Sequence, residues 1–116
     1  MKLCAMRLFT RLQVPENPTV LDLGCGTGIA TFALIRKMEG KGQFFGIDLS
    51  DKMINIARAK VERLCYHNVK FSKSDAEKMI FPKSSFDLVY SNQMFHWIMD
   101  KEKMLREVLR VLRPTG

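Results

Sequence analysis

Three glycines at alternate positions, Gly24, Gly26 and Gly28, stand in the stretch "VLDLGCGTGIA", between a short apolar run and a helical pattern. A glycine-rich turn at such a junction lets the backbone approach a ligand closely, with N–H groups of the helix pointing at it. The turn lacks the lysine of a phosphate loop, and Ile29 stands where the dinucleotide fingerprint needs its last glycine. The remaining pattern is D-x-G-x-G-x-G. Its Asp22 would repel a pyrophosphate but suits a ligand that carries an ammonium group.

Polar residues also follow the other apolar runs of strand length. Asp48 comes twenty residues after Gly28, where an acidic side chain can accept hydrogen bonds from ribose hydroxyls. Asp75 follows the third run, and Ser91 and Asn92 close the fourth. Any one of these residues could instead be a helix cap or a turn residue. Because ligands bind outside the carboxyl ends of parallel strands, the four strand ends together predict one ligand site.

The elements that must position these residues alternate along the chain. The four runs expected to form strands cover residues 19–23, 43–48, 69–74 and 86–91. Helical spacing of apolar residues occurs at residues 28–38, 51–65 and 100–112. Ser50 is placed to cap the second of these helices. Strands that alternate with helices predict an α/β fold with a parallel sheet and right-handed crossovers.

The rest of the chain is interpreted as one small domain with an N-terminal extension. Residues 19–116 form the expected ligand-binding domain, and residues 1–18 are expected to be a helix and a linker, with Leu3, Met6 and Phe9 on one face. The last helix ends in "RPTG", a turn that normally leads into another strand, and no strand follows. A four-stranded sheet would leave its fourth strand unpaired on one side, which is an aggregation liability. We therefore expect a fragment or a truncated gene product, and an oligomer could form through that open edge.

Composition excludes several classes of protein. No apolar run approaches the ~20 residues of a membrane span. The three cysteines are odd in number and far apart, so we expect reduced thiols, a cytoplasmic location and no metal site. The net charge of +7 is spread from Arg7 to Arg113 rather than gathered in one block. A solvated basic surface is therefore a better interpretation than a nucleic-acid interface.

Four segments carry a family resemblance. They are "VLDLGCGTG", "GIDLS", "SDAEKMIFPKSSFDLVYSN" and "LREVLRVLRPTG", and they resemble the successive motifs of the class I S-adenosylmethionine-dependent methyltransferases over residues 19–116. The resemblance implies a Rossmann-like three-layer sandwich with a mostly parallel sheet. About four of the seven family strands are present. It also implies an enzyme that uses S-adenosylmethionine as the methyl donor.

The resemblance assigns roles to individual residues. Asp22 and the turn Gly24–Gly28 would hold the methionine moiety, and Asp48 would bind the ribose hydroxyls. Asp75 would contact the adenine amino group, with the Ala76 backbone beside it. Ser50 and Met53 would flank the nucleoside, although helix packing explains Met53 equally well. The residues expected to bind the cofactor are Asp22, Gly24, Cys25, Gly26, Thr27, Gly28, Asp48, Leu49, Ser50, Met53, Asp75, Ala76, Ser91 and Asn92.

The segment "SNQMFHWIMD", after the fourth strand, is expected to line the acceptor side. His96 is the candidate general base for an acceptor that must lose a proton, and Phe95 and Trp97 could wall the pocket. The alternative is that His96 and Trp97 cover the cofactor and pack against the last helix. We favour this alternative over a catalytic role.

The acceptor is expected to be a small molecule or a carrier-bound acid, methylated at oxygen or carbon. The segment has neither the Asn/Asp-Pro-Pro-Tyr/Phe motif of enzymes that methylate exocyclic nitrogens nor a nucleophilic cysteine, which argues against a nucleic-acid substrate. It is similar to methyltransferases of the malonyl carrier-protein, trans-aconitate and quinone-pathway groups. A second hypothesis is a non-catalytic module that binds the cofactor, or a partner through its open sheet edge.

Overall fold

A central sheet with helices on both faces organises the chain in the computed structural model, which describes residues 6–9, 14–92 and 100–114. The sheet has five strands in the order β1-β5-β2-β3-β4. Its strands are β1 (Met6–Phe9), β2 (Thr19–Leu23), β3 (Gln43–Asp48), β4 (Val69–Lys73) and β5 (Leu88–Asn92). Its helices are α1 (Ile29–Lys37), α2 (Asp51–Leu64) and α3 (Lys101–Val111). Strands β2 to β5 are parallel, which confirms the predicted Rossmann-like α/β fold.

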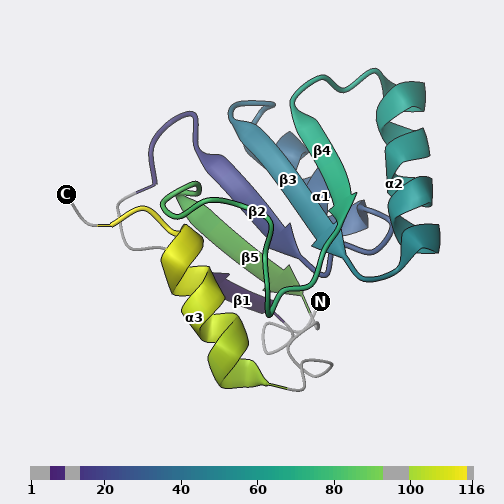
Figure 1. The fold of residues 1–116 in the computed structure, drawn as a ribbon. Helices are drawn as coiled ribbons and strands as arrows, with labels where there is room; N and C mark the ends of the chain where they lie inside the picture. The colour runs from purple at the N-terminus through teal and green to yellow at the C-terminus, as the bar shows by residue number, and fades with distance from the viewer. Residues whose placement is uncertain (1–5, 10–13, 93–99, 115–116) are drawn as a thin grey trace.

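The N-terminal segment differs from the prediction. Residues 6–9 form β1, which pairs antiparallel with β5, rather than a turn of helix. A helix of about a dozen residues is marginal on its own, whereas the edge of β5 offers unpaired N–H and C=O groups along its length. The prediction that this fourth predicted strand has an open edge is therefore wrong, because β5 lies between β1 and β2 (Figure 1). The prediction of an oligomer through that edge is therefore not supported, since β1 occupies it.

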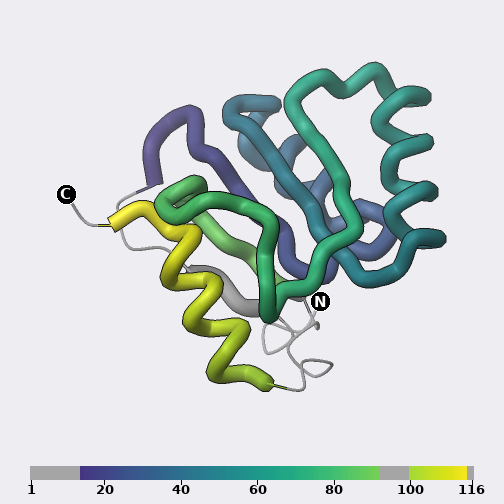
Figure 2. The backbone as a smooth tube through the Cα atoms, in the orientation of Figure 1, coloured from purple at the N-terminus to yellow at the C-terminus, as the bar shows by residue number. Residues whose placement is uncertain are grey.

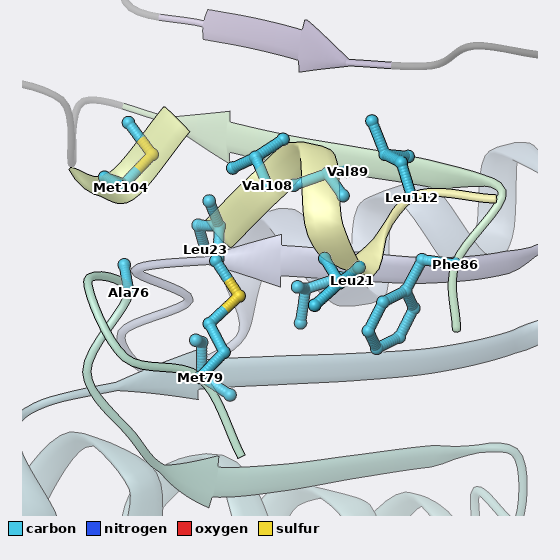
Figure 3. Close-up of a cluster of buried hydrophobic side chains, with 11 residues drawn as sticks. Leu21, Leu23, Ala76, Met79, Phe86, Val89, Met104, Val108 and Leu112 are labelled. Atoms are coloured by element: carbon cyan, nitrogen blue, oxygen red, sulfur yellow. The ribbon is translucent and has the colours of Figure 1, made fainter. Parts of the chain in front are cut away.

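The two faces of the sheet bury separate apolar clusters. On one face, Leu21 and Leu23 of β2 and Val89 of β5 pack with Met104 and Val108 of α3 (Figure 3). On the other face, side chains of β2, β3 and β5 pack against α1 and α2. This cluster includes Val20, Phe44 and Leu88 of the strands, Phe32 and Ile35 of α1, and Ile54 and Ala57 of α2. Because side chains alternate along a strand, Asp22 lies on the α1 face, between two leucines that point to α3.

The segment that connects β4 to β5 crosses the sheet on the α3 side (Figure 2). Two residues of α3 hold it: Glu107 Oε1 accepts a hydrogen bond from the Met79 N–H at 2.6 Å, and Arg110 Nη1 donates to the Phe81 carbonyl at 2.8 Å. Arg110 also donates to Glu107, and this bond lowers the pKa of the carboxyl. The connection is thereby held against α3 without a helix of its own.

No helix in the described part of the chain is long and apolar enough to cross a membrane. Cys25 is buried and Cys65 is exposed, and both are free thiols. Cys65 ends α2 in the left-handed conformation, with φ of 58°.

Candidate functional site

The turn between β2 and α1 is built on left-handed backbone. Gly24, Gly26 and Gly28 have φ of 69°, 56° and 89°, a region that residues with a side chain rarely adopt. A Cβ on Gly28 would also lie 2.9 Å from the ring of Phe32. The N–H groups of Gly24 and Cys25 both donate to the Ile47 carbonyl, at 2.8 and 3.0 Å. The turn is therefore tied to the end of β3.

Asp22 is a buried acid that hydrogen-bonds to α1. Its side chain is 2% exposed, and Thr31 Oγ1 of α1 donates to Oδ2 at 2.5 Å. Among the described residues, Oδ1 has no hydrogen-bond partner. Burial raises the pKa of Asp22 to about 7, the Thr31 hydrogen bond opposes the rise, and the nearby charge of Asp48 adds to it. A buried carboxylate oxygen without a donor is costly, so a cationic ligand group placed there would gain a strong hydrogen bond.

A cavity of about 570 Å³ opens beside this acid. That volume lies within the range of small-molecule sites. Residues of β2, of the glycine turn, of α1 and of β5 line it: Asp22, Gly24, Cys25, Thr27, Ile29, Ala30, Ala33, Leu34, Lys37 and Tyr90. Burial, and secondly the charge of Asp22, raise the pKa of Tyr90. The cavity wall therefore combines one buried acid with a largely apolar surface.

Asp48 joins the glycine turn to the start of α2. Its Oδ2 accepts the Gly26 N–H at 2.9 Å, and its Oδ1 accepts the Ser50 N–H at 2.9 Å. Ser50 Oγ in turn accepts the Met53 N–H at 3.2 Å, which confirms the predicted cap of α2. Each carboxylate oxygen can accept more than one hydrogen bond, so Asp48 retains capacity for two ligand hydroxyls. Leu49 and Met53 are 56% and 40% exposed beside it and offer apolar surface to a flat ring.

The end of β4 lies next to Asp48, because the Ser74 N–H donates to the Asp48 carbonyl at 3.1 Å. Asp75 follows it and is exposed, and its Oδ1 accepts the Glu77 N–H at 2.9 Å in a local turn. Ala76 is fully buried in the α3-side cluster. The structure thus brings the ends of β2, β3 and β4 to one edge of the sheet.

The remaining predicted residues divide into two groups. Ser91 is buried in β5 in register with Leu23, and Asn92 ends that strand. Within the described residues, Ser91 Oγ has no hydrogen-bond partner. The acceptor-side candidates Phe95, His96 and Trp97 lie outside the described residues.

Sequence reasoning missed two residues that surround Asp22. Thr31 is the donor to the acid, and Tyr90 lines the cavity from β5. The alternation of side chains along β5 could have identified Tyr90. It lies two residues after Leu88, so both side chains lie on the face of the sheet that α1 covers. No local signal marks Thr31, because its role depends on how α1 packs over β2.

A mostly parallel sheet with a glycine turn after one strand and an acid ending the next defines a Rossmann-like nucleotide-cofactor domain. A family profile described as a methyltransferase domain matches residues 15–116. The chain belongs to the class I S-adenosylmethionine-dependent methyltransferase family.

Relatives agree with this assignment. A demethylmenaquinone methyltransferase of Lactococcus lactis is 37% identical over 84% of this chain and 39% of its own length. Another, of Geobacillus stearothermophilus, is 33% identical over 91% of this chain and 45% of its own. A solved structure of a SAM-dependent methyltransferase from Aquifex aeolicus superposes with a TM-score of 0.80 at 33% identity, over 88% of this chain and 54% of that one. The chain spans less than half the length of these two curated relatives.

Proposed function

We propose that the chain binds S-adenosylmethionine at the glycine turn and takes part in methyl transfer to a small-molecule acceptor of the quinone class. The buried Oδ1 of Asp22, which has no hydrogen-bond partner in the described part of the chain, carries the proposal, because it lies beside a glycine turn and at the wall of a ligand-sized cavity. The relatives named demethylmenaquinone methyltransferases support the quinone class. A carrier-bound acid is the alternative acceptor.

The residues around the turn have separate roles in this proposal. Asp22 accepts a hydrogen bond from the ammonium of the methionine moiety, and Asp48 accepts from the ribose hydroxyls while it keeps its bonds to Gly26 and Ser50. Asp75 and the Ala76 N–H contact the adenine. When bound, the cofactor supplies an electrophilic methyl group that its own sulfonium charge activates.

The protein then acts mainly by positioning the two reactants. Phe95, His96 and Trp97 are proposed to line the acceptor side. His96 is the candidate base only if the acceptor must lose a proton.

Titration calorimetry with S-adenosylmethionine and S-adenosylhomocysteine tests the proposal. The wild-type chain should bind both. Asp48→Ala should weaken both by roughly 10- to 100-fold, since it removes charge-assisted hydrogen bonds of about 1.5–3 kcal/mol. The control Asp51→Ala removes an exposed carboxylate that pairs with Lys73, and it should leave both affinities unchanged.

Each outcome has a distinct meaning. Unchanged binding by Asp48→Ala would refute the ribose assignment. A folded wild-type chain that binds neither ligand would overturn the proposal. Binding without methylation of a quinol or a carrier-bound acid would favour a non-catalytic cofactor-binding module.

A further inference from the structure

A side chain of α2 bonds the second half of the glycine turn, which is residues 27 and 28. Lys60 lies in α2, is half-buried, and its Nζ donates a hydrogen bond to the Thr27 carbonyl at 3.2 Å. The two residues are 33 positions apart. The first half of the turn already has other ties, to the Ile47 carbonyl and to Asp48. In the part of the chain that the structure describes, Lys60 provides the side-chain hydrogen bond to the second half, residues 27 and 28.

The contact acts on one particular peptide unit. The carbonyl of Thr27 and the N–H of Gly28 belong to the same planar group. Lys60 donates to the Thr27 carbonyl, and the Gly28 N–H donates to the Cys25 carbonyl at 2.9 Å. The plane is therefore held from both sides.

Hydrogen bonds are needed to fix the orientation of the Thr27–Gly28 peptide, because one of its two residues is glycine. Rotation of the Thr27–Gly28 peptide changes ψ of Thr27 and φ of Gly28. Gly28 has φ of 89°, and glycine populates positive and negative φ about equally. Rotation of the peptide is thus cheap in the absence of hydrogen bonds. Thr27 also lines the cavity beside Asp22, so a rotated peptide would change the wall that faces the ligand.

We propose that Lys60 is a positioning residue for the methionine half of the cofactor, because it fixes the orientation of the Thr27–Gly28 peptide. The inference rests on the proposed function, since it concerns the same site. A turn ordered before binding loses less conformational entropy when the ligand arrives. The adenosine half is proposed to depend on Asp48 and its neighbours, whereas the hydrogen bond of Lys60 goes to the Thr27 carbonyl.

Calorimetry of the whole chain with two ligands distinguishes effects on the methionine half of the cofactor from effects on its adenosine half. One ligand is S-adenosylmethionine, and the other is 5′-methylthioadenosine, which lacks the amino-acid part. Lys60→Met should weaken S-adenosylmethionine binding by about 5- to 20-fold and leave 5′-methylthioadenosine binding within twofold. Lys60→Arg keeps a cationic donor and should restore most of the affinity. The control Lys70→Met, at an exposed position of β4, should bind both ligands as the wild type does.

Three results would overturn the positioning role. The first is wild-type affinity of Lys60→Met for S-adenosylmethionine. The second is an equal loss of both ligands, and the third is loss of the fold by circular dichroism, since either would show a general structural role. A folded wild-type chain that binds neither ligand would instead overturn the proposed function, and the inference with it.

Discussion

Replacement of Asp22 by Asn should stabilise the unliganded chain at alkaline pH, although it removes a proposed ligand contact. The side chain is 2% exposed, and its pKa rises from 3.8 to about 7 on folding. Between these values the folded chain holds more protons than the unfolded chain, so the free energy of unfolding falls as pH rises. Above about pH 7 both states are ionised at this position and the full cost is present. Asparagine has a similar shape and can still accept the Thr31 hydrogen bond, but it carries no charge.

The magnitude follows from the two pKa values. The difference between the two pKa values lowers the free energy of unfolding by about 2 kcal/mol at pH 5 and by about 4 kcal/mol at pH 8. The stability gained by Asp22→Asn should therefore be larger at pH 8 than at pH 5, by about 2–3 kcal/mol. Urea unfolding of both chains at the two pH values measures this difference.

The control is Asp51→Asn, which changes an exposed carboxylate that pairs with Lys73. Its effect on unfolding should be the same at both pH values. If Asp22→Asn changed stability equally at pH 5 and pH 8, the inference that burial raises the pKa of this acid would be wrong.

Cofactor binding should release the proton that Asp22 carries in the unliganded chain. If the ligand ammonium binds ionised Asp22, binding at pH 6 releases a proton from the wild-type chain. The heat of binding should then differ between two buffers with different ionisation enthalpies. Equal heats in the two buffers would contradict a change in the charge of Asp22, and Asp22→Asn should show little buffer dependence.

Two further predictions concern packing, and urea unfolding measures both. Gly28→Ala should lower the free energy of unfolding by about 2–3 kcal/mol, because the new Cβ would lie 2.9 Å from the ring of Phe32 and the backbone is left-handed. Gly26→Ala should lower it by about 1 kcal/mol, since Gly26 has φ of 56° but a Cβ there would meet nothing within 4 Å. Equal losses in the two variants would refute the steric argument. Met104→Ala should cost about 2–5 kcal/mol because this side chain is buried under α3, whereas Leu109→Ala, at a position 48% exposed on the same helix, should change stability by less than about 0.5 kcal/mol.

Local patterns were sufficient for most of the fold. The apolar runs at Thr19–Leu23 and Gln43–Asp48 form strands with those bounds. Helical spacing placed α2 to within one residue, and its Ser50 cap was predicted. These features depend on neighbours a few residues apart, so they can be recognised without the fold.

The N-terminal segment shows where such reasoning fails. Its apolar spacing fits a helix, yet residues 6–9 pair as β1 with β5, eighty or more positions later in the chain. The partner that decides between helix and strand is remote in sequence. A local periodicity holds no information about it.

The candidate site divides in the same way. The sequence by itself determined the glycine turn, the acid at its start and the acid that ends β3, because backbone conformation and strand ends follow from local residue types. Only the tertiary structure decided that Thr31 and Tyr90 surround Asp22, that Lys60 reaches the Thr27 carbonyl, and that the pKa of Asp22 rises. Those properties come from burial and from contacts between elements far apart in the chain, which exist only once the sheet and its helices have packed.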